Sequence, residues 1–306
     1  MLKEEILPLF GERLRKTLED TSIDFEKLQE IRCRVEKPLM LLVNGREHWM
    51  KEAASMREIR EIVDRACGYS GYAFEEEIVR GYLTIEGGHR IGLTGNAVLG
   101  KEKLITLKYI TGLNIRIAHE VKGCAEKWKS YLYENQSPCH CLIISPPGCG
   151  KTTLLRDVIR LFSDGTLERP GVSVGVVDER SEIAGTYRGT PAFELGLRTD
   201  VMDGCPKILG MEMLLRSMAP RVLAVDEIGI LDVKAIEHAL RCGVKMLATL
   251  HGAGLEDFME KPGFESLVKE QVFERYILLK QGQTPGRVRK IFGRNFERIW
   301  EDNICM

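Results

Sequence analysis

Short apolar runs alternate with amphipathic stretches in the second part of the chain, from about residue 121 onward. The runs are almost continuously apolar, which is typical of strands buried on both faces of a sheet. Their alternation with helices favours a mostly parallel, doubly wound α/β sheet with helices on both faces. The predicted strands are 141–145, 172–177, 222–225, 245–250 and 276–279, and the predicted helices are 152–163, 209–219, 232–242 and 265–273.

The first third of the chain has a mixed pattern. Apolar residues at helical spacing predict helices within 1–20 and 53–68, whereas 30–35 and 39–43 resemble strands followed by an Asn44-Gly45 turn. We therefore expect a smaller α+β N-terminal domain, 1–120, followed by the larger domain, 121–306. Further expected segments are a hairpin joining 82–85 to 90–94 through Gly87-Gly88, a strand at 113–117, a helix at 125–132 and a linker at 135–138.

Length and charge narrow the classes of function. The chain has 306 residues, and domains of about 100–200 residues suggest two of them. Lys and Arg total 44 against 45 Asp and Glu, a formal net charge of -1, which excludes a strongly basic protein that binds nucleic acid through bulk charge. The apolar runs are about a third of the length that spans a bilayer, and the acidic N-terminus does not resemble a secretory signal. We expect a soluble, cytosolic protein.

Cysteine usage agrees with a reducing compartment. The nine cysteines are an odd number and are scattered from Cys33 to Cys305, which favours free thiols over a disulfide framework. The tight cluster Cys139-His140-Cys141 lacks a second Cys/His pair at zinc-site spacing. We therefore interpret Cys141 as the start of a buried strand and expect no metal at this cluster.

The strongest chemical signal is a glycine-containing loop between a predicted strand and a predicted helix. Gly148 and Gly150 allow the backbone to curl so that its N–H groups point at phosphate oxygens, next to the positive end of the helix. Lys151 would reach the β- and γ-phosphates, and the hydroxyl of Thr152 would bind Mg²⁺. This is a Walker A motif in which Ser145 replaces the first glycine. The residues expected to contact ATP are Ser145, Pro146, Pro147, Gly148, Cys149, Gly150, Lys151, Thr152 and Thr153.

Two further strands end in acidic residues. The run 222–225 is followed by Asp226 and Glu227, the expected Walker B carboxylates, and the run 172–177 by Asp178 and Glu179. Because ligands bind at the carboxyl edge of such a sheet, these side chains should surround one Mg²⁺-nucleotide. We expect Asp226 and Asp178 to lie at the metal with Thr152. Spacing alone does not decide the catalytic base, for which Glu227 is favoured over Glu179.

Other polar residues could act at the phosphates. Thr249 and His251 end a further buried strand, where a side chain could sense the terminal phosphate. A cationic side chain is needed to stabilise the charge that develops during phosphoryl transfer, and Arg180 is the candidate nearest to the acidic strand ends. The remaining arginine candidates are Arg188, Arg198 and Arg216 in the larger domain, and Arg90 and Arg116 in the first.

The motif set resembles the secretion ATPase superfamily, which includes type II and type IV secretion and pilus-retraction motors. The phosphate loop, Asp178-Glu179-Arg180, Asp226-Glu227 and Thr249-Leu250-His251 match its Walker A, aspartate, Walker B and histidine boxes in order. Walker B has Asp-Glu where secretion motors have Gly-Glu, so the catalytic base stays open. More specifically, segments 198–207, 215–221 and 224–229, with 30–35, 89–92 and 113–118, look like the stage III sporulation protein AA family of endospore-forming bacteria.

The resemblance implies a P-loop NTPase fold of the RecA-like kind and a Mg²⁺-dependent ATPase motor. It also implies a homo-hexameric ring that is bound to membrane proteins of a secretion-like channel. That channel would act between mother cell and forespore, with the motor on the cytoplasmic, mother-cell face. A nucleic-acid partner is not expected, because the chain is not basic and no aromatic stacking platform is evident. Two alternatives stay open: a nucleic-acid-dependent ATPase, and a nucleotide-binding scaffold that hydrolyses little.

Overall fold

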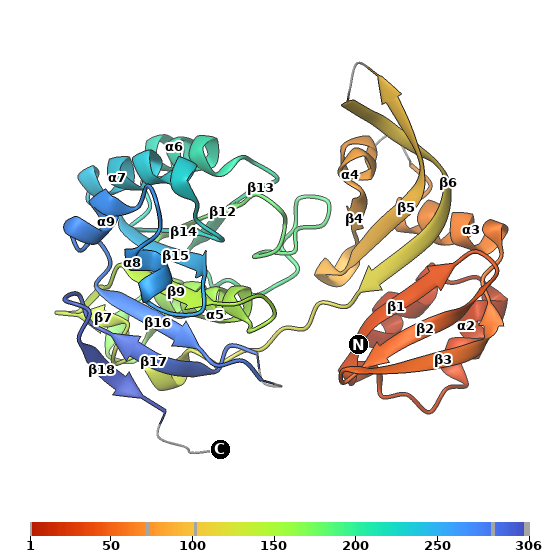
Figure 1. Ribbon diagram of the computed structural model, residues 1–306, viewed down its shortest axis with the longest axis horizontal. Coiled ribbons are helices and arrows are strands. Elements are labelled where there is room, and N and C mark those ends of the chain that lie inside the picture. Colours follow the sequence, from red (N-terminus) through yellow and green to blue (C-terminus); the bar gives the residue numbers. More distant parts are fainter. Residues whose placement is uncertain (1, 71–73, 101–102, 283–284, 303–306) are drawn as a thin grey trace. The chain divides into compact units, whose positions relative to one another are not determined.

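The computed structural model describes residues 2–70, 74–100, 103–282 and 285–302 (Figure 1). The chain divides into two units, each with its own core. The first comprises Met1–His119 together with a loop segment, Gly185–Ala192, and the second comprises Glu120–Ala184 and Phe193–Met306. No helix in the described ranges is long and apolar enough to cross a membrane.

The first unit is built on a six-stranded antiparallel sheet in the order β3-β2-β1-β6-β5-β4. One face of the sheet carries alternating apolar residues, such as Ile31, Ile91 and Ile115, which pack with Leu14 and Ile59 of the helices. The strands are β1 (Leu28–Arg34), β2 (Lys37–Val43), β3 (Arg46–Ala53), β4 (Tyr82–Thr84), β5 (Arg90–Gly100) and β6 (Lys103–Arg116), and the helices are α1 (Leu2–Ile6), α2 (Glu12–Glu19), α3 (Met56–Ala66) and α4 (Glu75–Arg80).

The second unit is built on an eight-stranded sheet in the order β13-β12-β14-β15-β9-β16-β17-β18. The neighbouring pairs from β13 to β16 are parallel, and β17 and β18 extend the sheet in antiparallel fashion. The strands are β9 (Cys141–Ser145), β12 (Val174–Asp178), β13 (Thr199–Asp203), β14 (Val222–Val225), β15 (Lys245–His251), β16 (Arg275–Leu279), β17 (Val288–Phe292) and β18 (Arg298–Glu301).

Helices cover both faces of this second sheet (Figure 1). Side chains alternate along the buried strands, so Ile143 of β9 belongs to one core with Leu155 of α5, and Ile144 belongs to the other with Ile236 of α7. This arrangement confirms the predicted mostly parallel α/β sheet. The helices are α5 (Lys151–Asp164), α6 (Lys207–Ser217), α7 (Val233–Arg241), α8 (Glu256–Met259) and α9 (Glu265–Lys269).

The structure corrects several predicted elements. Residues 125–132 contain a single 3₁₀ turn, Glu126–Trp128, in place of the predicted helix. The backbone N–H of Ala125 donates to the carboxylate of Asp157, and this tertiary hydrogen bond overrides the helical pattern of the stretch. The expected linker at 135–138 contains part of a small ribbon that pairs Tyr133–Glu134 with Ser137–Pro138. The helix expected at 265–273 ends at Lys269, since Val272 and Phe273 turn into the core. Strand β13 was not predicted, because a sheet edge tolerates its polar sequence Thr-Asp-Val-Met-Asp.

Candidate functional site

The phosphate loop connects the buried strand β9 to helix α5. Gly148 and Gly150 have φ values of +74° and +87°, the left-handed region in which a side chain is strained. A Cβ at Gly150 would also lie 2.2 Å from the backbone N of Gly286, so close approach of a second loop excludes any side chain there. Ser145 is the last residue of the strand and is buried, and its position in the motif accommodates the hydroxymethyl group.

Lys151 is held inside the loop that precedes it. Lys151 is only 6% exposed, and its Nζ donates hydrogen bonds to the carbonyl oxygens of Ser145 and Pro146 at 3.0 and 3.2 Å. A buried lysine is tolerated only with such polar partners. The loop therefore already concentrates positive charge and curled backbone at one point, which is the chemistry that a phosphate group requires.

The predicted Walker B carboxylate, Asp226, contacts the helix that follows the phosphate loop. Asp226 follows β14, and its Oδ2 accepts a hydrogen bond from Thr152 Oγ1 at 2.7 Å. Its other oxygen, Oδ1, accepts from the hydroxyl of Thr249 on β15 and from the backbone N–H of Glu227. Thr249 is fully buried, and its Oγ1 lies 2.8 Å from the same N–H group. A hydroxyl and a carboxylate in contact form an oxygen pair of the kind that Mg²⁺ prefers.

Asp178 has a different set of partners from those expected of a metal ligand. It is 2% exposed, and its two oxygens accept three backbone N–H groups from the loop that follows it, those of Glu182, Ile183 and Ala184 at 2.7–2.9 Å. Burial nevertheless raises the pKa of Asp178 to about 6, because desolvation of the charged form outweighs these hydrogen bonds. The geometry favours a carboxylate that holds its own loop.

The two acidic strand ends meet around one small cavity. It measures about 70 Å³, large enough for a water molecule, and Glu179 and Glu227 both line it. Arg180 Nη1 lies 3.7 Å from Glu227 Oε2, although both side chains are well exposed. The structure therefore brings both candidate bases and the candidate arginine together, as the shared sheet edge predicts.

A cation that sequence reasoning missed also lines this cavity. Lys207, the first residue of α6, directs Nζ at the backbone carbonyls of Asp226 and Glu227. The lysine is present in the sequence segment Asp-Gly-Cys-Pro-Lys207, but no local sequence pattern indicates where its side chain points.

The remaining candidate residues, His251 and the other arginines, do not line this cavity. His251 is exposed at the end of β15 and lines a cleft of about 590 Å³ with Pro146. Arg198 Nη1 donates to the carbonyl of Ser163 at 2.9 Å, and Arg216 lies 3.9 Å from Glu212 on its own helix. Arg188 belongs to the first unit, as do Arg90 and Arg116, which line a groove of about 640 Å³ on the sheet of that unit with Arg32, Arg34 and Lys37.

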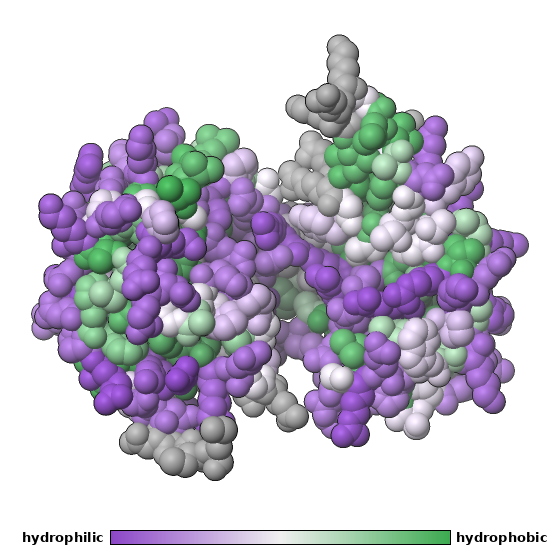
Figure 2. All heavy atoms as spheres, in the orientation of Figure 1, coloured by the Kyte–Doolittle hydropathy of each residue, from purple (hydrophilic) through white to green (hydrophobic). Residues whose placement is uncertain are grey.

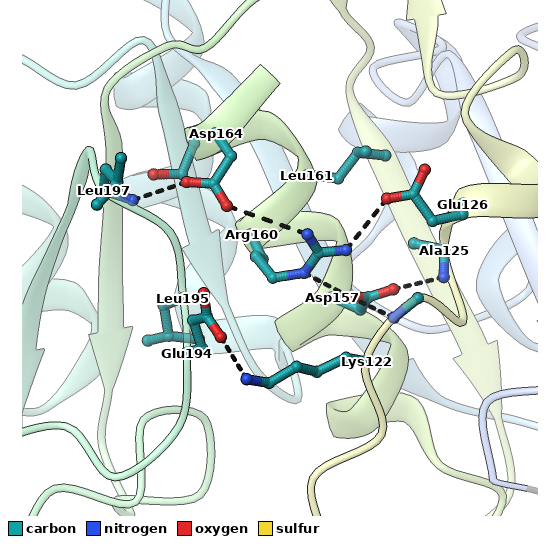
Figure 3. A network of polar contacts seen from close by, with 12 residues as sticks. Lys122, Ala125, Glu126, Asp157, Arg160, Leu161, Asp164, Glu194, Leu195 and Leu197 are labelled. Atoms are coloured by element: carbon teal, nitrogen blue, oxygen red, sulfur yellow. Dashed lines mark hydrogen bonds and ion pairs between the residues drawn. The ribbon is translucent and has the colours of Figure 1, made fainter. Parts of the chain in front are cut away.

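Helix α5, which begins at the phosphate loop, is anchored by a polar network (Figure 3). Asp157 is 3% exposed and accepts hydrogen bonds from the backbone N–H groups of Gly123 and Ala125 at 3.0 and 2.6 Å. Arg160 donates to Asp157 at 2.9 Å and to Glu126 at 3.2 Å. The network ties the chain entering the second unit to the helix that presents Thr152, and partly buried, hydrogen-bonded pairs of this kind hold their geometry.

The cysteine–histidine cluster has a structural role. Cys139 and Cys141 are buried, and His140 Nδ1 accepts the backbone N–H of Met246 at 3.1 Å. Burial lowers the pKa of His140, which favours the neutral imidazole. Within the part of the chain that the structure describes, no group of three or more His, Cys, Asp and Glu residues could hold a metal ion.

Comparison with solved structures defines the class of fold. The chain resembles the ATPase DotB of Legionella pneumophila with a TM-score of 0.57 and 16% identity, covering 94% of this chain and 78% of that one. It resembles the pilus retraction motor PilT, solved with bound ADP, with a TM-score of 0.50 and 12% identity, covering 90% and 77%. The protein thus has the fold of the P-loop secretion ATPases, which confirms the predicted fold class.

The particular family follows from the sequence comparisons. The model of the family "Sporulation stage III, protein AA" matches residues 1–299, so the chain belongs to this family. The stage III sporulation protein AA of Bacillus subtilis (strain 168) is 40% identical over 293 residues, which cover 95% of each chain. The predicted family is therefore confirmed.

Proposed function

We propose that this protein is the Mg²⁺-dependent ATPase motor of a secretion-like channel complex that acts between mother cell and forespore during endospore formation. The contact of Thr152 Oγ1 with Asp226 Oδ2 at 2.7 Å carries the proposal. It joins the Walker A hydroxyl to the Walker B carboxylate beside a buried lysine, and these three groups are what a Mg²⁺-nucleotide needs. Family membership supplies the context of sporulation.

The roles of the residues follow from their chemistry. Backbone N–H groups of residues 146–151 and the ammonium of Lys151 would bind the phosphates, while Thr152 and Asp226 would hold Mg²⁺. The bound metal would polarise the phosphoryl oxygens and neutralise developing charge. Asp178 is assigned to its loop instead, because both of its oxygens already accept backbone N–H groups.

Glu227 is the proposed base for the attacking water, and Glu179 is the second candidate. Both line the small cavity beside Asp226. Arg180 is proposed to stabilise charge near Glu227. His251 is proposed as a sensor of the terminal phosphate, at the end of the strand that also carries Thr249.

The motor is proposed to form a homo-hexameric ring that is peripheral to the membrane and bound to membrane proteins of the channel. Apolar side chains on α6 support an association surface, and Figure 2 shows apolar surface over this helix. Leu209 and Met213 of α6 are 51% and 44% exposed, and Met218, the residue that follows the helix, is 46% exposed. Exposed apolar groups of this size gather where proteins associate.

The test is phosphate release from ATP with and without Mg²⁺, together with molar mass from light scattering. The wild type should hydrolyse ATP only with Mg²⁺, and its mass should approach six subunits with nucleotide. Lys151→Ala should lose both nucleotide affinity and turnover, while Lys269→Ala, at the exposed last residue of α9, should match the wild type. Hydrolysis that survives in Lys151→Ala would place the activity outside the phosphate loop.

A nucleic-acid-dependent ATPase is the second candidate. The groove lined by Arg32, Arg34, Arg90 and Arg116 is the observation that favours it, since arginine-lined grooves bind phosphate backbones. Strong stimulation of turnover by single-stranded DNA or RNA would support this alternative. Nucleotide binding without turnover under every condition would instead indicate a scaffold.

A further inference from the structure

Lys207 occupies a position that local electrostatics disfavour. It is the first residue of α6, where the unsatisfied N–H groups give the helix end a partial positive charge. Acidic side chains stabilise such an end and cations do not. A residue that breaks a local rule is explained by its tertiary partners, and those of Lys207 lie on the Walker B turn.

The ammonium group of Lys207 is fixed by backbone and side-chain oxygens. Nζ donates to the carbonyl oxygen of Glu227 at 2.7 Å and to that of Asp226 at 3.3 Å. It also lies 3.7 Å from Glu179 Oε2 and 3.5 Å from Asp232 Oδ2. The side chain is only 16% exposed, so these contacts are poorly screened by solvent. One cation therefore links both acidic strand ends.

The turn that Lys207 contacts has an unusual backbone. Glu227 has a φ of +49°, in the left-handed region that non-glycine residues adopt only when their surroundings hold them there. From one side, the N–H of Glu227 is held by Asp226 Oδ1 and Thr249 Oγ1. From the other side, its carbonyl is held by Lys207. These hydrogen bonds together hold the backbone conformation of Glu227 and so determine the direction in which its side chain projects.

Lys207 also contacts Asp232, which lies five residues after Glu227. Asp232 is 6% exposed, and its Oδ2 accepts the backbone N–H of Gly229 at 2.8 Å as well as facing Lys207. Lys207 thereby connects the start of α6 to both ends of the segment 226–232. Loss of its charge would leave the buried Asp232 carboxylate without this cation and would release the carbonyl of Glu227.

From these contacts we infer that Lys207 is a positioning residue for Glu227, which it holds in the orientation that ATP hydrolysis requires. This inference rests on the proposed function. Lys207 acts through Glu227 and does not bind the phosphates, which Lys151 serves. Its loss should therefore lower turnover and leave nucleotide binding intact.

The test is a double-mutant cycle of Lys207→Met and Glu227→Gln, with kcat, KM and the affinity for a fluorescent ATP analogue measured for each protein. Lys207→Met should lower kcat about 10- to 100-fold and change KM by less than about threefold. In the Glu227→Gln background the same substitution should change kcat by less than about twofold, because the side chain that it orients is already inactive. Lys269→Met is the matched control, and it should equal the wild type.

The outcomes separate this inference from the function on which it rests. An active wild type whose Lys207→Met variant keeps full turnover, or loses as much again in the Glu227→Gln background, overturns the positioning role alone. A wild type that releases no phosphate overturns the proposed function and this inference with it. If Lys207→Met does not fold, as judged by circular dichroism, Lys207→Gln takes its place in the cycle with the same expected loss and the same non-additivity.

Discussion

Two neighbouring strands of the second unit lead into the same three residues, Val-Asp-Glu, and place the acids in different environments. β12 and β14 are parallel, with Val177 beside Val225, so Asp178 and Asp226 occupy equivalent positions, one residue beyond this last pair. Asp178 turns into its own loop and accepts three backbone N–H groups. Asp226 instead accepts two threonine hydroxyls from other elements.

The difference arises from the chain after each strand. After Asp178 the loop folds back so that residues 182–184 aim their N–H groups at the carboxylate. After Asp226 the left-handed Glu227 directs the chain away, and the carboxylate stays in contact with the phosphate-loop helix. Identical residues at equivalent positions thus have different partners: one carboxylate holds its own loop, and the other contacts Thr152 and Thr249, as the proposed Mg²⁺ site requires.

The largest expected effect is a loss of turnover, and it tests whether Glu227 or Glu179 is the catalytic base. Glu227→Gln should retain ATP binding and lower turnover by about 10²–10⁴, the scale of losing a positioned proton acceptor. Glu179→Gln removes the equivalent acid of the other strand end and should have a much smaller effect. Phosphate release and nucleotide affinity are measured for both variants. Unchanged turnover in Glu227→Gln with a large loss in Glu179→Gln would reverse the two roles.

A medium effect concerns the pH dependence of stability. Because burial raises the pKa of folded Asp178 to about 6, above the usual 3.8, the folded protein binds the proton more tightly than the unfolded chain does. This contribution to stability is fully present below about pH 4 and is lost as the pH rises through 6, up to about 3 kcal/mol for a shift of this size.

Asp178→Asn should remove that dependence. Urea unfolding at intervals between pH 4 and pH 7 should show the wild type losing stability relative to the variant as the pH rises. Titrating groups that do not interact with Asp178 are common to both proteins, so their effects cancel in the difference. A difference that is constant with pH, or that grows in favour of the wild type toward neutral pH, would show that the loop N–H groups outweigh burial.

The smallest expected effect concerns Arg180. Its ion pair with Glu227 is 3.7 Å long, and the two side chains are 66% and 47% exposed. Exposed pairs contribute about 0–1 kcal/mol, so Arg180→Gln should barely change the midpoint of thermal unfolding. Turnover should fall by about two- to tenfold through weaker positioning of Glu227. A loss beyond about a hundredfold would instead indicate that Arg180 acts directly on the phosphates.

Much of this architecture could be predicted from local sequence. Strands 141–145 and 222–225 have the bounds that their apolar runs predict, since a segment buried on both faces requires apolar residues throughout. The phosphate loop is equally local, because Gly148 and Gly150 supply its backbone conformation. Edge strands such as β13 were not predicted, because a strand with one neighbour needs neither alternating nor continuous apolar residues.

The sequence by itself determined the α/β order of the second unit, the phosphate loop and the acidic ends of two strands, all of which depend on residues that are adjacent in the chain. Only the tertiary structure decided what each acid contacts. Thr249 and Lys207 reach the Walker B turn from 22 and 20 residues away. Such partners are selected by the order in which parallel strands pack, and no local pattern of hydrophobic and polar residues encodes which hydroxyl or ammonium group that packing places beside a given carboxylate.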